Sequence, residues 1–178
     1  MTTRKMAMIS RMIAAVAVLT AAIEVRAGAD KVTFPENWAK GVVYMIIDRP
    51  NNKQLTEYYV SQAAIDAAKK GEPLPSGTII TAVGFRAKVD EQGIPVKGPD
   101  GHFVKMGDPT GYRVMQKAAG WGTDYLEDKR NGEWEYRVFN ADKTVNTTAD
   151  LNGCFGCHKP QAKQDYVFTY DKLTLAAR

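Results

Sequence analysis

The stretch Cys154-Phe155-Gly156-Cys157-His158 contains both cysteines of the chain and one of its two histidines. A Cys-x-x-Cys-His run is the attachment pattern of c-type haem. Its two thiols, three residues apart, can reach the two vinyl groups on one edge of the porphyrin as thioethers. The histidine that follows brings an imidazole beneath the iron. The stretch therefore predicts one covalent haem c, with Cys154 and Cys157 bound to the porphyrin and His158 as an axial ligand of the iron.

Three other interpretations of this stretch fit less well. A thioredoxin-like redox pair begins a helix after a strand in a βαβ unit, and no such unit precedes residue 154. A structural zinc site needs four nitrogen or sulfur ligands, and outside the stretch the chain offers His102 alone. A disulfide across so short a loop would be strained and would leave His158 without a role.

Residues 1–27 have the pattern of a secretory signal peptide. Basic residues precede an apolar run over 12–23, which is too short to span a bilayer as a mature helix, and the tripeptide 25–27 ends in a small residue. Because c-type haem is attached outside the cytoplasm in bacteria, we expect cleavage after Ala27 and a periplasmic protein. Glu24 is atypical of a cleavage region, and a retained membrane anchor is the alternative. Residues 28–178 have the length of one domain.

The basic character of the chain belongs mostly to residues 1–27. The formal net charge is +4, and removal of the four basic residues and one acidic residue in this segment leaves +1. The mature chain has no basic stripe interleaved with aromatic residues, so we expect no nucleic-acid partner. It has no other apolar stretch of spanning length, so we expect no membrane association after processing.

The mature chain has the pattern of an α+β fold, mainly an antiparallel β-sheet with a few short helices. β-branched and aromatic runs predict strands over residues 41–47, 55–60, 77–88, 103–106, 112–116, 134–139 and 166–169. Helices are predicted over 34–40 and, capped by Ser61, over 62–70. Asn131-Gly132 predicts a hairpin-type turn, and the cysteine stretch predicts a short helical turn.

Two blocks of the chain resemble the cytochrome P-460 and cytochrome c′-beta family. One is residues 154–160 followed by Asp165-Tyr166-Val167-Phe168-Thr169, and the other is Gly120-Trp121-Gly122 with Gly132-Glu133-Trp134-Glu135-Tyr136. The resemblance extends over about 34–173. It implies a β-rich fold, often a homodimer, with one c-type haem that has a histidine on one face. The opposite face is usually open or holds a small ligand, and members either oxidise hydroxylamine or bind nitric oxide and related gases.

The family resemblance makes one position decisive. In the hydroxylamine-oxidising branch, a lysine on the strand after a Gly-Thr pair forms an extra covalent link to the porphyrin. Here the pair is Gly77-Thr78, and Ala82 falls where that lysine is expected. An alanine cannot make the bond, and Lys88 lies roughly 20 Å further along an extended strand. The resemblance therefore favours the branch without the cross-link, with hydroxylamine oxidation as the alternative.

The face of the haem opposite His158 has several candidate residues. Phe85, on the same strand as Ala82, would help to form an apolar cap, although it also fits an ordinary core position. Gln116 corresponds to an acidic residue in relatives; its amide would be a poor proton acceptor where a carboxylate acts as a base. A surface glutamine is the alternative. Ala82, Phe85 and Gln116 are thus the predicted distal-pocket residues.

A sixth ligand of the iron would distinguish an electron carrier from a gas-binding protein. The candidates are His102, which fits a solvated turn equally well, and three methionines that also fit core positions, namely Met45, Met106 and Met115. We expect a c′-beta-like cytochrome that binds nitric oxide, carbon monoxide or hydroxylamine and exchanges electrons with a redox partner. An electron carrier with a methionine as sixth ligand is the alternative.

Overall fold

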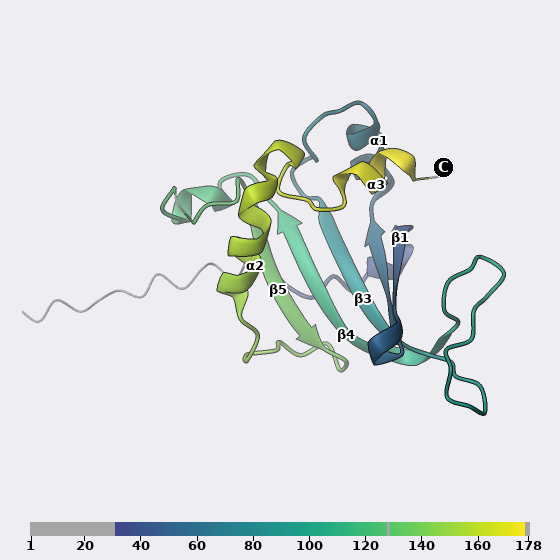
Figure 1. The fold of residues 1–178 in the computed structure, drawn as a ribbon. Helices are drawn as coiled ribbons and strands as arrows, with labels where there is room; N and C mark the ends of the chain where they lie inside the picture. The colour runs from purple at the N-terminus through teal and green to yellow at the C-terminus, as the bar shows by residue number, and fades with distance from the viewer. Residues whose placement is uncertain (1–30, 128, 177–178) are drawn as a thin grey trace, which may run out of the picture.

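The structure is a computed structural model that describes residues 31–127 and 129–176. The predicted signal peptide, residues 1–27, lies outside the described residues. Five antiparallel strands form one sheet in the order β1-β2-β3-β4-β5 (Figure 1). Their bounds are Val42–Arg49 for β1, Gln54–Val60 for β2, Ile79–Ala87 for β3, Lys105–Lys117 for β4 and Trp134–Asn140 for β5. The prediction of an α+β fold built on an antiparallel sheet is confirmed.

The helices of the described residues are short. They are α1 (Gln62–Lys69), α2 (Leu151–His158), α3 (Tyr170–Leu175) and the 3₁₀ helices η1 (Trp38–Lys40), η2 (Pro50–Asn52), η3 (Trp121–Asp124) and η4 (Lys159–Gln164). In Figure 1, α2 lies along β5 at one edge of the sheet, while α1 and α3 pack together near β1 at the other edge. The helix predicted after Ser61 is confirmed, and the Ser61 hydroxyl accepts a hydrogen bond from the backbone N–H of Ala64. Among the described residues, no helix is long and apolar enough to cross a bilayer.

The predicted closing strand over 166–169 is wrong. These residues form turns between η4 and α3, and both Asp165 and Tyr166 have left-handed φ values, 52° and 60°. The backbone N–H groups of Tyr166 and Val167 are bonded to the carbonyls of Gln161 and Gln164, so they are not available to a strand ladder. The apolar run was misleading because Val167 is buried as a turn residue.

Two smaller predictions about the sheet also need correction. Residues 105–106 and 112–116 of the two predicted strands belong to one long strand, β4, which pairs with β3 across an irregularity between Gly84 and Arg86, whereas Phe103 forms only an isolated bridge with Lys97. Polar residues and glycines in the middle of β4 obscured its continuity. Asn131-Gly132 does form a turn next to β5, but residues 118–133 as a whole connect β4 to β5, so it does not close a two-residue hairpin.

The two faces of the sheet carry two separate hydrophobic clusters. Side chains alternate between the faces along each strand. On the α2 face, the cluster joins strand residues to α1, α2 and α3 and includes Tyr44, Ile65, Met115, Tyr136, Phe155 and Leu173. On the far face, the cluster joins strand residues to the segment before β1 and includes Val32, Leu55, Tyr59, Val83, Phe85 and Phe139. The site is built on the α2 face.

Candidate functional site

Helix α2 carries both thiols and His158 and is held on the sheet by Phe155. The Phe155 side chain is 7% exposed, and its ring lies 4.8 Å from that of Tyr136 and 5.1 Å from that of Tyr125. The Asn131 amide donates to the Phe155 carbonyl at 3.0 Å. The two residues between the cysteines thus include the anchor of the helix, which fixes the thiols relative to the sheet.

The two cysteines form no disulfide with each other, and they differ in exposure. Cys154 is half-buried against the α2-face cluster, whereas Cys157 is exposed. Burial raises the pKa of the Cys154 thiol; nearby Asp150 also raises it and Arg113 lowers it. Within the described residues, no group of three or more His, Cys, Asp and Glu side chains could hold a bare metal ion. Two thiols beside one histidine are the donor set that covalent haem attachment needs.

His158 has one ring nitrogen engaged and one available. Its Nδ1 lies 2.7 Å from the carbonyl oxygen of Tyr166, and because a carbonyl only accepts hydrogen bonds, Nδ1 carries the proton and donates. In the neutral imidazole, Nε2 then keeps its lone pair. The ring lies 4.9 Å from that of Tyr136 and 5.0 Å from that of Phe168. Burial lowers the pKa of His158, against the opposing effect of the Tyr166 carbonyl, and so favours the neutral ligating form. The thiols of Cys154 and Cys157 and the neutral imidazole of His158 therefore fit a covalently attached haem.

Ala82 lies on the α2 face of the sheet, as the predicted site requires. It is 8% exposed and lies two residues from Ile80, a member of the α2-face cluster, so both side chains project from the same face. Its cross-strand neighbours are Tyr58 on β2 and Arg113 on β4. On the other side of Tyr58, Met45 continues the same row on β1. Ala82 therefore lies on the central strand of the sheet, on the face against which α2 packs.

Phe85 and Gln116 do not lie on that surface. Phe85 is buried in the far-face cluster, with Lys105 Nζ 4.9 Å from its ring centroid. Gln116 alternates with Met115 of the α2 face and pairs with Ile79 of the far-face cluster. The structure thus removes both residues from the predicted distal pocket. The physical reason is the period of two along a strand: Phe85 is an odd number of residues from Ala82, and Gln116 from Met115.

The predicted sixth ligands are also separated by the structure. His102 lies in the connection between β3 and β4, with Nδ1 3.4 Å from an Asp48 carboxylate oxygen, and Met106 is 48% exposed at the start of β4. Met45 and Met115 instead pack on the α2-face cluster. Those two methionines share the face of His158.

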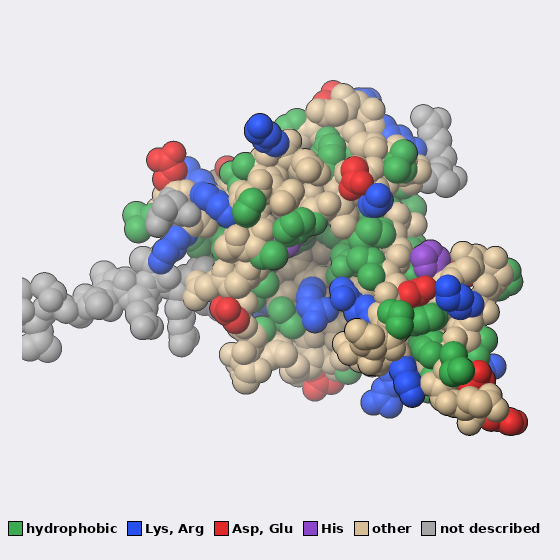
Figure 2. Space-filling view, in the orientation of Figure 1, with side chains coloured by type: hydrophobic (Ala, Val, Ile, Leu, Met, Phe, Trp, Pro, Cys, Tyr) green, Lys and Arg blue, Asp and Glu red, His purple; other side chains and the backbone are tan. Residues whose placement is uncertain are grey.

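Arg113 is a site residue that sequence reasoning missed. It is exposed and lies opposite Ala82, and among the described residues it makes no hydrogen bond or ion pair. Figure 2 shows a hollow on this face of the molecule with basic side chains along it. The available signal was its spacing: Arg113 is two residues from Met115 and therefore projects from the same face.

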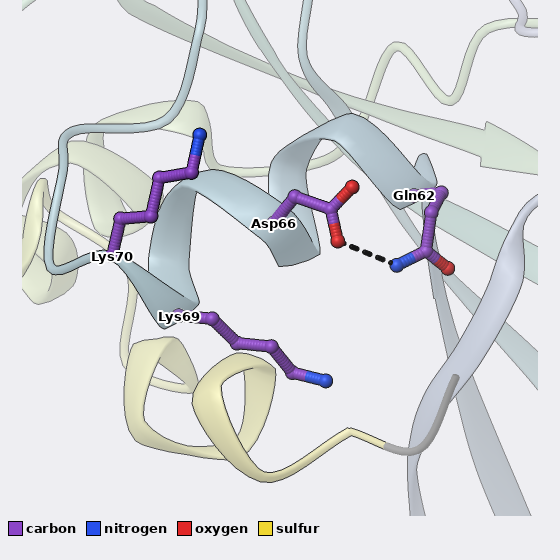
Figure 3. A pocket seen from close by; sticks show the side chains of 4 residues that line it. All are labelled: Gln62, Asp66, Lys69 and Lys70. Atoms are coloured by element: carbon purple, nitrogen blue, oxygen red, sulfur yellow. Dashed lines mark hydrogen bonds between the residues drawn. The ribbon is translucent and has the colours of Figure 1, made fainter.

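A pocket elsewhere on the surface involves none of the predicted site residues. It is lined by four polar residues of α1 and its C-terminal end, Gln62, Asp66, Lys69 and Lys70 (Figure 3). The Gln62 amide donates to Asp66 at 2.9 Å, and Lys69 Nζ donates to the carbonyl of Ala176. This arrangement is that of a solvated helix face.

Comparison with known proteins agrees with this geometry. The family model described as Cytochrome P460 matches residues 35–169, from the segment before β1 to the turn before α3. A comparison with curated proteins gives no match. The matched region contains the whole sheet, the two thiols and His158. The chain belongs to the cytochrome P460 family and is a haem-binding cytochrome.

Proposed function

We propose that this chain is a mono-haem c-type cytochrome of the c′-beta type that binds nitric oxide or a related small ligand. Cys154 and Cys157 hold the haem covalently, and His158 is the axial ligand on the α2 side. The observation that carries the proposal is the hydrogen bond from His158 Nδ1 to the Tyr166 carbonyl, which leaves Nε2 as the ligating atom. Bound haem supplies an iron that can take a diatomic ligand on its other face.

The surroundings of Ala82 support a haem without a lysine cross-link. The side chain is a buried methyl group. Lys117, on the same face of the sheet, is engaged by Asp165 at 2.9 Å, and Lys88 follows the end of β3 and is exposed. Intact mass of the proteolytic haem peptide tests this point. We expect the mass of the α2 peptide plus one haem. A product that also contains a lysine peptide would favour the alternative function, hydroxylamine oxidation. Turnover of hydroxylamine with an artificial electron acceptor would then measure that activity.

The sheet surface proposed to face the bound ligand is not purely apolar. Ala82 and Tyr58 offer small and aromatic surface, but Arg113 adds a cation beside them. A guanidinium there interacts favourably with ligands that carry or develop negative charge. The proposed site therefore accepts diatomic gases and also favours anions at the ferric iron.

Optical spectroscopy of the purified protein tests the proposal most directly. We expect the reduced protein to have an open sixth position and to bind both carbon monoxide and nitric oxide. If the reduced protein does not bind carbon monoxide, the gas-binding proposal is overturned. The ligand that the protein meets in the cell then follows from the relative affinities for nitric oxide, carbon monoxide and hydroxylamine.

An electron carrier is the second candidate, and the position of Met45 favours it. Met45 packs on the α2-face cluster and occupies the same cross-strand row as Ala82. If its sulfur is the sixth ligand, Met45→Leu converts a low-spin haem to a high-spin one that binds carbon monoxide. Met106→Leu is the matched control, because Met106 is exposed at the start of β4.

Location and assembly follow from the same proposal. In bacteria a c-type haem is attached outside the cytoplasm, and the pattern of residues 1–27 supports a mature periplasmic protein that begins at Gly28. N-terminal sequencing of the exported protein tests the cleavage site. The family resemblance supports a homodimer, which sedimentation equilibrium of the holoprotein tests. A periplasmic redox partner reduces the iron, and its identification requires reduction kinetics with candidate donors.

A further inference from the structure

We propose that Asp165 is a positioning residue for His158. Its carboxylate fixes the Tyr166 carbonyl to which the imidazole donates, and it thereby sets the strength of the bond from His158 to the iron. This inference rests on the proposed ligation of the iron by His158.

The Asp165 carboxylate joins three separate parts of the molecule. It accepts hydrogen bonds from the backbone N–H of Leu74 at 2.8 Å and from Lys117 Nζ at 2.9 Å to both oxygens. Trp134 Nε1 lies 3.4 Å from one of these oxygens. The side chains of Lys117 and Asp165 are each 13% exposed. The carboxylate is therefore held at once by the segment before β3, the end of β4 and the start of β5.

Tyr166, the next residue in the chain, connects the Asp165 carboxylate to the imidazole of His158. Asp165 and Tyr166 are consecutive residues with left-handed φ values, which non-glycine residues rarely adopt and which persist where the surroundings fix them. The Tyr166 N–H is bonded to the Gln161 carbonyl at 2.8 Å, and the Tyr166 carbonyl accepts from His158 Nδ1 at 2.7 Å. The Tyr166 ring also packs closely on Gly132, where an added Cβ would come within 2.9 Å of a ring carbon.

The hydrogen bond at Nδ1 controls the electron density available at Nε2. A strong acceptor fixed in line with Nδ1–H orients the ring and raises the basicity of the ligating nitrogen. A more basic ligand stabilises ferric iron and lowers the reduction potential. Asp165 therefore influences the bond to the iron by holding the Tyr166 carbonyl in place, through the backbone of Tyr166.

The holoprotein with Asp165→Asn tests this inference. The substitution keeps the size of the side chain but removes its charge and replaces an acceptor by a donor. We expect a lower iron–histidine stretching frequency in resonance Raman spectra of the reduced protein and a higher midpoint potential. Asp171→Asn is the matched control, because Asp171 is an exposed carboxylate of the same C-terminal segment that pairs with Lys172. It should change neither quantity.

Lys117→Gln covers the case in which Asp165→Asn lowers the yield of folded holoprotein. It breaks the same ion pair from the other side, and we expect the midpoint potential to move in the same direction. Wild-type potentials in both variants, at wild-type haem content and far-UV circular dichroism, would overturn the inference. So would an equal shift in Asp171→Asn. His158→Gly tests the ligation separately: an unaltered optical spectrum would overturn the proposed ligation, and this inference with it.

Discussion

The two cysteines of α2 have different surroundings, and this should be measurable in haem-free protein. Cys154 is half-buried and the pKa of its thiol is raised by burial, whereas Cys157 is exposed. A raised pKa means that less thiolate, the nucleophilic form, is present at neutral pH. We predict that iodoacetamide alkylates Cys157 first, and that the rate at Cys154 rises at a pH above the ordinary value of about 8.5 for cysteine.

Mass spectrometry of peptides from protein expressed without haem attachment measures both rates. The variants Cys154→Ser and Cys157→Ser serve as controls, since each reports one thiol alone. Faster alkylation of Cys154 at neutral pH would contradict the packing of this residue against the α2-face cluster.

Arg113 should tune the affinity of the ferric protein for anions. Arg113 pairs with Ala82 across the sheet on the α2 face, and its guanidinium has no carboxylate partner among the described residues. A unit charge at such an exposed site contributes on the order of 1 kcal/mol, which corresponds to about fivefold in affinity. We predict that Arg113→Leu weakens azide binding to the ferric protein by about that factor and changes carbon monoxide binding to the ferrous protein little.

Titrations of the optical spectrum with azide and carbon monoxide measure these affinities. Arg86→Leu is the matched control, because Arg86 is an exposed arginine of the same face, four residues along β3 from Ala82. If both variants lose azide affinity equally, the effect belongs to the overall charge of the face and no specific role of Arg113 remains.

At the scale of elements, α1 depends on its N-terminal cap. The Ser61 hydroxyl accepts a hydrogen bond from the Ala64 N–H, and the helix buries Ala64, Ile65 and Ala68. Loss of an N-cap costs about 1 kcal/mol. We predict that Ser61→Ala lowers the free energy of unfolding by about that amount, as measured by urea denaturation. Thr147→Ala, at an exposed residue outside the helices and strands, should stay within about 0.5 kcal/mol of wild type.

The elements that the sequence predicted well are those with strong local patterns. The Ser61 cap, the alternating run of β5 and the β-branched run of β1 each act within a few residues, and all three occur in the structure. The turn over 166–169 could not be predicted in this way, because its left-handed backbone depends on partners distant in the chain, such as Leu74. Local apolar pattern alone favours a strand there.

The candidate site shows the same division between local and distant information. The thiols and His158 are defined by a five-residue spacing, so the sequence sufficed to name them. Phe85 is three residues from Ala82 on the same strand, so alternation alone already placed it on the other face. The face of Gln116 relative to Ala82 depends on the register of β3 and β4, which a resemblance to relatives did not supply. The Tyr166 carbonyl could not be found from side-chain identities at all, since a backbone atom makes the contact.

At the scale of the whole molecule, the sheet separates the surroundings of the proposed haem on the α2 face from the hydrophobic cluster on the far face. Met115 lies on the α2 face, opposite Tyr136, whose ring is 4.9 Å from that of His158. Leu55, which is 2% exposed, lies in the far-face cluster. Interiors are closely packed, so truncation of either side chain leaves a cavity. The cavity opens beside the proposed haem in one case and behind the sheet in the other.

This separation yields a paired prediction for Leu55→Ala and Met115→Ala. Each should lower the free energy of unfolding by about 2–5 kcal/mol in urea denaturation, because each removes most of a buried apolar side chain. Met115→Ala should also shift the Soret band and change the rate of carbon monoxide binding, whereas Leu55→Ala should leave both at wild-type values. The control is the haem content per protein, which must be equal in all three proteins. A Soret shift in Leu55→Ala as large as that in Met115→Ala would mean that the two faces are mechanically coupled through the sheet, and the assignment of the haem to the α2 face would lose its support.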